Sequence, residues 1–270
     1  MTAVTDWSSY DSVAGRYDEV WGSRFEEVAG SIWKCVSPAP GASVLDIGTG
    51  TGIVPHALGS RALALSGLTG CDRSTGMIHV ARSRMPALRL VAADATALPF
   101  RDSSFDVATA SFVLSHLRSY ETALVEAHRV LRPGGMFAMT SWATDTEAHG
   151  DAWRQLLADA ISKDLLQAAV AQVAPSESCF ESTAGVESAL TRAGFAGVEV
   201  RILLLECRLS LDQFLADREL SSGARFARHT LGAVAWGRFV AHAREELGRR
   251  FGSLFTFPRG VLIGLGQRAA

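Results

Sequence analysis

The sequence has no apolar run long enough to span a membrane, and its polar N-terminus does not resemble a secretory signal peptide. Its formal net charge of −2 argues against nucleic acid as the main partner, because phosphate binding requires a concentrated basic surface. Its four cysteines form no C-x-x-C pair and have no zinc-ligand spacing. We therefore expect a cytoplasmic protein with no nucleic-acid, membrane or metal partner, and core roles for Cys71 and Cys207.

The chain has enough apolar sequence to build a substantial core. Its 270 residues are 48% apolar, which suits one α/β domain with insertions, or one domain with a small cap. Lysine is almost absent, since Lys34 and Lys163 are the only two.

A glycine-rich turn organises the first half of the chain. Ser43–Ile47 is a short apolar run broken by one acid, as expected of a buried parallel strand. Gly48, Gly50 and Gly52 follow, and Ile53–Leu58 is predicted to begin a helix. Such a turn lets a ligand lie against bare peptide groups and places a helix N-terminus near a carboxylate or phosphate.

The spacing of this turn separates it from other nucleotide-binding loops. A dinucleotide fingerprint requires its third glycine at position 53, which is Ile53, and a Walker loop requires a lysine that is missing. Asp46, two residues before the first glycine, is foreign to the dinucleotide pattern. Acid-x-G-x-G-x-G resembles the first motif of class I S-adenosylmethionine (SAM) methyltransferases. A tight turn in some other α/β protein is the alternative.

A second acid follows at the end of the next predicted strand, Leu65–Asp72. Asp72 lies twenty residues after Gly52, the spacing at which an acid on a neighbouring parallel strand can reach ribose hydroxyls. Its alternative interpretation is a solvated turn acid. Further strands are predicted at Leu88–Ala93, Phe105–Ala110 and Met136–Trp142.

Five ordered motifs extend the resemblance over residues 10 to 142. They are similar to the successive motifs of small-molecule SAM methyltransferases, most of all the group of ubiquinone and menaquinone biosynthesis and natural-product enzymes. After the glycine turn they read Gly70-Cys71-Asp72-Arg73-Ser74, Ala93-Asp94-Ala95 with Leu98-Pro99-Phe100, Ser104-Phe105-Asp106, and Arg129-Val130-Leu131-Arg132-Pro133-Gly134-Gly135, and the leader is Ala14-Gly15-Arg16-Tyr17-Asp18.

The resemblance implies a Rossmann-like α/β fold: a seven-stranded, mostly parallel sheet with helices on both faces, plus helical cap insertions. It implies SAM as the cofactor. Gly48, Gly50 and Gly52 would carry its methionine part, and Asp46 would face the ammonium group. The remaining implied roles are Asp72 on the ribose, Arg73 and Met77 beside the adenine, Asp94 and Ala95 on its ring edge, Ser111 beside the methionine chain, and Tyr17 closing over the cofactor.

The rest of the chain is predicted to cover this site. We expect a helical lid over residues 1–40, a SAM-binding domain over 41–270, and helical caps at about 143–180 and 210–252, with Phe255–Gly266 as an antiparallel closing strand. The acceptor is expected to be a small, largely apolar molecule beneath the caps, beside His149, Arg225 and His229. Trp142, Trp153, Phe226 and Trp236 are predicted to line a pocket or to pack in the core. A monomer and a homodimer are both compatible with the sequence.

His116, just after the fourth strand, is the best-placed proton acceptor for a hydroxyl nucleophile. It could equally contact the cofactor or pack locally. His56, His79, His128 and His242 fall in predicted helices and are expected to be structural or exposed.

Two other function classes share the cofactor motifs. One is a SAM-fold enzyme with a non-methylating reaction such as a cyclisation, and the other is a noncatalytic SAM-binding protein. A base N-methylating enzyme is disfavoured, because the strand-four exit reads Ser111-Phe112-Val113-Leu114 in place of an Asn/Asp-Pro-Pro-aromatic motif.

Overall fold

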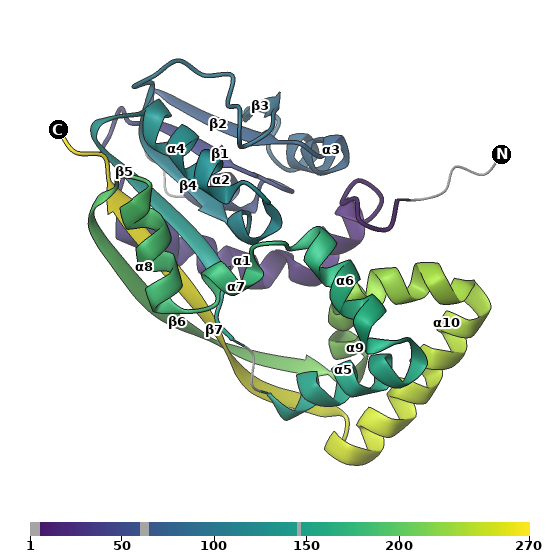
Figure 1. Ribbon diagram of the computed structural model, residues 1–270. Helices are drawn as coiled ribbons and strands as arrows, with labels where there is room; N and C mark the ends of the chain where they lie inside the picture. Colours follow the sequence, from purple (N-terminus) through teal and green to yellow (C-terminus); the bar gives the residue numbers. More distant parts are fainter. Residues whose placement is uncertain (1–5, 60–64, 145–146) are drawn as a thin grey trace.

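A computed structural model describes residues 6–59, 65–144 and 147–270, and within these ranges the chain forms one seven-stranded sheet (Figure 1). The order is β3-β2-β1-β4-β5-β7-β6; β1 to β5 are parallel, and β7 is antiparallel to both neighbours. The predicted fold, including the antiparallel closing strand, is confirmed. The strands are β1 Ser43–Ile47, β2 Gly67–Asp72, β3 Arg89–Ala92, β4 Phe105–Ser111, β5 Leu131–Trp142, β6 Ala196–Ser210 and β7 Leu254–Gln267.

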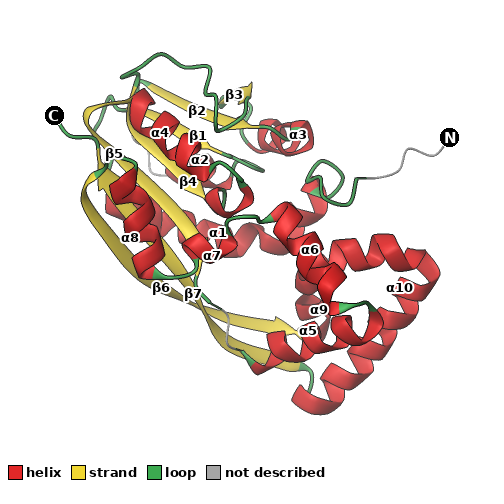
Figure 2. Cartoon of the chain, viewed as in Figure 1, coloured by secondary structure: helices red, strands yellow, loops and turns green. Residues whose placement is uncertain are grey.

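Helices cover both faces of the sheet (Figure 2). Successive strand residues point to opposite faces, so Val44 packs with α1 and α2, whereas Leu45 and Ile47 pack with α4 and α8. The helices of this part are α1 Ala14–Val36, α2 Ile53–Gly59, α3 Thr75–Arg84, α4 Tyr120–Val130, α7 Glu177–Phe180 and α8 Thr183–Arg192, with a short 3-10 turn, η1, at Leu114–His116.

The two predicted caps gather around a long β6–β7 ribbon. Beyond Trp142, which pairs with Val261, β7 pairs only with β6, as far as Ser210 and Leu254. β7 extends one residue beyond the predicted strand Phe255–Gly266 at each end. Figure 1 shows the cap helices clustered at its far end. They are α5 Ala148–Ala160, α6 Lys163–Val173, α9 Leu211–Glu219 and α10 Ser222–Phe251, with α10 broken at Gly232.

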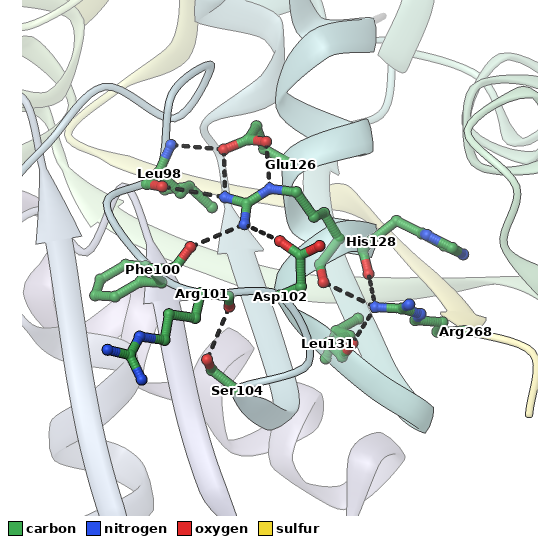
Figure 3. A network of polar contacts seen from close by, with 10 residues as sticks. Leu98, Phe100, Arg101, Asp102, Ser104, Glu126, His128, Leu131 and Arg268 are labelled. Carbon is green, nitrogen blue, oxygen red and sulfur yellow. Dashed lines mark hydrogen bonds and ion pairs between the residues drawn. The ribbon is translucent and has the colours of Figure 1, made fainter.

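Two of the sequence motifs have a structural role in the fold. The Arg129 guanidinium bonds both oxygens of Glu126, at 2.7 and 2.8 Å, and the Phe100 carbonyl at 2.8 Å (Figure 3). Glu126 in turn accepts from the Leu98 N–H at 2.8 Å. These bonds fasten the loop between β3 and β4 to α4, so the Leu98–Phe100 and Arg129 motifs organise the fold away from the ligand-binding edge.

Several expectations from composition can be compared with the described part of the chain. No described helix is both long and apolar enough to cross a membrane. The four cysteines are free thiols, and Cys71 and Cys207 are buried as predicted. Of the expected lid and caps, residues 1–5 and 145–146 lie outside the described residues.

Candidate functional site

A pocket of about 630 Å³ lies at the carboxyl ends of β1 to β4, the edge at which open α/β sheets bind ligands. Ten of the twelve predicted site residues line it. Asp46 and Gly52 are not among the lining residues. The ten are Tyr17, Gly48, Gly50, Asp72, Arg73, Met77, Asp94, Ala95, Ser111 and His116.

The three glycines of the turn have different roles, although all have positive φ. A Cβ on Gly48 would lie 2.3 Å from a methyl group of Val113, and one on Gly52 would lie 3.1 Å from Cβ of Ala81 in α3. Both therefore serve close packing. A Cβ on Gly50 would meet nothing nearer than the Gly48 carbonyl oxygen at 4.0 Å, so it would project into open space. Gly50 alone of the three leaves room for a ligand.

The Asp72 carboxylate is held at the pocket by backbone donors. Oδ2 accepts from the Gly50 N–H at 2.9 Å and Oδ1 from the Ser74 N–H at 2.8 Å. Ser74 also caps α3, accepting from the Met77 N–H at 3.1 Å. Burial raises the pKa of Asp72 against the opposing effect of these bonds. Each carboxylate oxygen can accept a further hydrogen bond from a ligand.

Asp46 lies in β1 immediately before the glycine turn and is 1% exposed. Its Oδ1 accepts from the Thr109 hydroxyl at 2.6 Å, while its buried Oδ2 makes no hydrogen bond of normal geometry among the described residues, although the Thr49 hydroxyl acts on the carboxyl to lower its pKa. Burial raises the pKa of Asp46 to about 7. A buried carboxyl with one unsatisfied oxygen is a place where a cationic ligand group would gain a strong electrostatic partner.

The remaining polar groups of this half are already oriented. Asp94 Oδ1 accepts from the hydroxyl and N–H of Thr96 at 2.7 and 2.8 Å, and these bonds lower the pKa of Asp94. The Ser111 and Thr140 hydroxyls bond to each other at 2.8 Å. Met77 is buried on α3, whereas Arg73 is exposed at the pocket rim.

His116 lies in η1, across the pocket from Asp72. Its Nδ1 is 2.9 Å from the Val173 carbonyl oxygen. Because a carbonyl only accepts, Nδ1 carries the hydrogen, and Nε2 is the basic nitrogen of the neutral ring. Burial lowers the pKa of His116, and the positive charges of Arg225 and Arg73 lower it further. The imidazole is therefore neutral at pH 7 and able to accept a proton.

Aromatic rings form the wall nearest His116. The Tyr10 ring meets those of His116 and Tyr17 edge-on, at 5.6 and 5.9 Å between centroids. Phe112 stacks on Trp142 at 4.4 Å. Its φ of 55° is rare for a bulky residue, and such strain is found mainly at functional sites. This side of the pocket favours a flat, partly apolar ligand.

The other predicted pocket groups lie elsewhere. Trp153 and Trp236 are buried with Phe239 in the core of the caps, and Phe226 packs on Trp7. His149 lies among phenylalanines of α9, α10 and β7. His229 is exposed on α10. His56, His79 and His242 are exposed, and His128 packs on Phe195, as expected of structural or surface histidines.

Sequence reasoning missed much of the lining. From the first cap, only the stretch around Val173 contributes, and among the described lining residues none belongs to 210–252. Residues 6 and 8–11, before α1, line the pocket instead. The one sequence signal for this was Tyr10, an aromatic residue close to the Ala14–Asp18 motif. The missed residues are Asp6, Ser8, Ser9, Tyr10, Asp11, Cys71, Ser74, Ala93, Thr96, Phe112, Val113, Leu117, Arg118, Ser119, Gln172, Val173 and Pro175.

Comparison with known proteins agrees with this geometry. The family model described as a methyltransferase domain matches residues 45–139. A demethylmenaquinone methyltransferase of Clavibacter sepedonicus is 33% identical over 210 residues, covering 72% of this chain and 83% of the relative. The chain belongs to the class I SAM-dependent methyltransferases. The cofactor of this family is SAM.

Other relatives are similar to this chain over shorter stretches, and the chain spans about three fifths of their length. The demethylmenaquinone methyltransferase of Streptomyces avermitilis is 38% identical over 154 residues, or 52% of this chain and 62% of the relative. Matches to two further enzymes of that name cover 57% and 58% of their lengths. The solved structure of the 4+2 cyclase SpnF has a TM-score of 0.60 at 18% identity, covering 97% of this chain and 94% of its own, a likeness of fold.

Proposed function

We propose that the protein is an enzyme that methylates a small, largely apolar, hydroxylated aromatic metabolite of the quinol or natural-product type, using SAM. The observation that carries this proposal is the meeting of Gly50, Asp72 and His116 in one pocket at the carboxyl edge of the sheet. Four free cysteines are compatible with the cytoplasmic location that we propose.

The residues present fit the cofactor of the family. The open space at Gly50 suits the methionine chain, and the unsatisfied oxygen of Asp46 suits its ammonium group, directly or through water. Asp72 would accept hydrogen bonds from the ribose hydroxyls. Met77 and Arg73 would pack beside the adenine, with Asp94 and Ala95 at its polar edge, Ser111 beside the methionine chain and Tyr17 above.

SAM supplies a methyl group already activated by its sulfonium charge. The chain's residues must therefore align the acceptor, exclude water and receive a proton. His116 Nε2 would take the proton of an acceptor hydroxyl, since Val173 holds the ring in the required tautomer. Removing that proton from a phenol makes both its oxygen and its ring carbons more nucleophilic, so O- and C-methylation are both compatible with this geometry.

The chemistry of the aromatic wall supports the acceptor class. Tyr10, Tyr17 and Phe112 line the pocket together with polar residues such as Arg118, Ser119 and Gln172. Aromatic rings of this kind pack on the flat ring of an aromatic acceptor, and the polar residues can bond to its hydroxyl groups. The relatives named demethylmenaquinone methyltransferases support an acceptor with a quinol ring.

The decisive experiment pairs binding with turnover. Calorimetry should detect SAM and its demethylated product, S-adenosylhomocysteine (SAH), and mass spectrometry should detect methyl transfer to members of a hydroquinone and naphthoquinol panel. His116→Asn keeps a donor for the Val173 carbonyl but removes the base. It should lower kcat at pH 7 by about 10²–10⁴-fold, with SAH affinity unchanged. Since the base must be neutral, wild-type kcat should rise with pH through the lowered pKa of His116 and level off by pH 7.

The exposed residue His79 provides the matched control, and His79→Asn should turn over like the wild type. A His116→Asn enzyme with full kcat would make His116 structural. A wild-type protein that binds neither SAM nor SAH would refute the proposed function. Binding of both ligands without methyl transfer to any acceptor would favour the non-methylating alternatives. The likeness to SpnF shows a shared fold and does not by itself favour a cyclisation.

A further inference from the structure

The segment Asp6–Val13, here called the strap, crosses the pocket before the chain enters α1. The N-terminal half of the strap is bound to the second cap, residues 210–252, by Arg225 of α10, which is more than 200 residues away in sequence. The guanidinium donates to the Trp7 carbonyl through Nε at 2.9 Å and through Nη2, and to the Ser9 carbonyl at 3.0 Å. Arg225 is 7% exposed, so these bonds are shielded from water.

Rings support the same attachment. The Arg225 guanidinium carbon lies 4.7 Å from the centroid of the Tyr10 ring, and Trp7 meets Phe226 edge-on at 5.1 Å. Cation–π and edge-to-face ring contacts of these kinds stabilise protein structures. Arg225 thus contacts two backbone carbonyls that precede Tyr10, those of Trp7 and Ser9, and also the ring of Tyr10 itself.

The C-terminal half of the strap is bound, through Asp11, to the start of α3, beside the part of the pocket that Gly50 and Asp72 line and that is here called the cofactor half. Asp11 Oδ1 accepts from the Ser74 hydroxyl at 2.7 Å and from the Gly76 N–H at the start of α3 at 2.8 Å. Ser74 also donates its N–H to Asp72. A carboxylate at a helix N-terminus is well placed electrostatically. The strap is therefore linked through one serine to the acid assigned to the ribose.

The middle of the strap lines the pocket through Ser8, Ser9, Tyr10 and Asp11. Tyr10 lies between Arg225 on one side and the rings of Tyr17 and His116 on the other. The strap cannot lift without breaking the bonds at one of its two ends. A strap held at both ends is thus in a position to restrict the movement of a ligand out of the pocket that it lines.

We propose that Arg225 is a positioning residue for the cofactor: by holding the Trp7 and Ser9 carbonyls it keeps Tyr10 and Asp11 over the pocket and slows cofactor release. The identity of the cofactor rests on the proposed function, whereas the seating of the strap does not. The cap thereby acts on the cofactor half without contributing a lining residue from 210–252.

The sharpest test acts at the other end of the strap. A Cβ on Gly76 would lie 2.6 Å from the Asp11 carbonyl oxygen and 2.7 Å from its Cα, so Gly76→Ala must displace the strap. The same change favours the helical state of α3, so the protein should stay folded. We expect SAH to dissociate about tenfold faster, corresponding to the loss of roughly one charge-assisted hydrogen bond. Gly237→Ala in α10, where a Cβ meets nothing within 4 Å, should release SAH at the wild-type rate.

Arg225→Met removes the donors and keeps the apolar stem, and it should also speed SAH release about tenfold. Arg225→Lys, which retains the charge without the fork, should be intermediate. Arg228→Met, at an exposed position on the same helix, is the control and should not differ from the wild type. Stopped-flow measurement of SAH release gives the rates.

Hydrogen exchange of residues 8–13 and of the Gly76 amide, measured without ligand, reports on the strap independently of what the protein binds. Faster exchange in Arg225→Met, together with faster SAH release in both variants, supports the proposal. Unchanged exchange in Arg225→Met overturns it, as does wild-type SAH release in both variants despite faster exchange. A wild-type protein that fails to bind SAH refutes the proposed function, while exchange still decides whether Arg225 holds the strap.

Discussion

The difference in stability between the Asp46→Asn variant and the wild type, both without ligand, should depend on pH. The variant should gain stability relative to the wild type as the pH rises. Burial raises the pKa of this carboxyl from 3.8 to about 7. Between these values the folded state keeps a proton that the unfolded state releases, so wild-type stability falls as the pH rises from 4 to 7 and then becomes constant. Asparagine has the shape of the protonated acid and never ionises.

The size of the effect follows from the pKa difference. A difference of about 3 units corresponds to about 4 kcal/mol above pH 8, and to about 1 kcal/mol at pH 4.5. The asparagine amide would replace an oxygen without a partner, which costs about 1–3 kcal/mol at any pH. That cost cancels when the two pH values are compared. The stability of Asp46→Asn relative to the wild type should therefore rise by about 3 kcal/mol between pH 4.5 and 8.5.

Urea unfolding of both proteins without ligand, at pH 4.5 and 8.5 and equal ionic strength, measures this double difference. Asp159→Asn, at an exposed position, is the matched control and should change stability by less than about 0.5 kcal/mol. Equal stability differences at both pH values would show that the folded state does not hold the Asp46 proton. Asp46→Asn should also bind SAH more weakly, because the charge assigned to the ammonium group is lost.

Two further substitutions test the pocket. Asp72→Ala should weaken SAM and SAH binding by about 1.5–3 kcal/mol, because the ribose hydroxyls lose a charged acceptor; unchanged calorimetric affinity would remove Asp72 from the site. Gly50→Val should abolish SAH binding while circular dichroism stays native, since its side chain would enter open pocket space. Gly41→Val is the control, because it also places a valine at a position of positive φ with no neighbour within 4 Å, and it should bind SAH normally. If Gly50→Val also binds SAH normally, the glycine turn is purely structural.

Sequence patterns were sufficient for the parts of the fold that depend on local signals. The apolar run at Ser43–Ile47, the glycine turn and the acid at Asp72 predicted β1, its loop and the end of β2. Ten of the twelve predicted site residues, nine of them given their role by the resemblance, line one pocket, and those at the ends of β1 to β4 meet there because parallel strands end at one edge of the sheet. The motif alone could not show that its glycines have different roles. Gly48 and Gly52 must lack a side chain because Val113 and Ala81, which come from distant parts of the chain, pack closely against them.

The missed features all depend on long-range contacts. No spacing rule links Arg225 to Trp7, and the strap has neither a helical nor a strand period to reveal it. The positive φ of Phe112 is set by its packing on Trp142 and Phe25, which the local sequence does not indicate.

The β6–β7 ribbon makes the second cap exchangeable. Ser210 and Leu254 are paired across the ribbon, and the Leu211 N–H donates to the Ser253 carbonyl at 3.0 Å. The chain therefore leaves β6 before α9 and enters β7 after α10 at adjacent positions. An excursion closed at its base leaves strand order and register unchanged whatever its length, and its closure entropy changes only slowly with the number of residues. A chimera that receives residues 211–253 from another methyltransferase should therefore keep the strand order and register of the sheet, but it would lose the attachment of the strap unless the incoming segment supplies a donor for the Trp7 and Ser9 carbonyls.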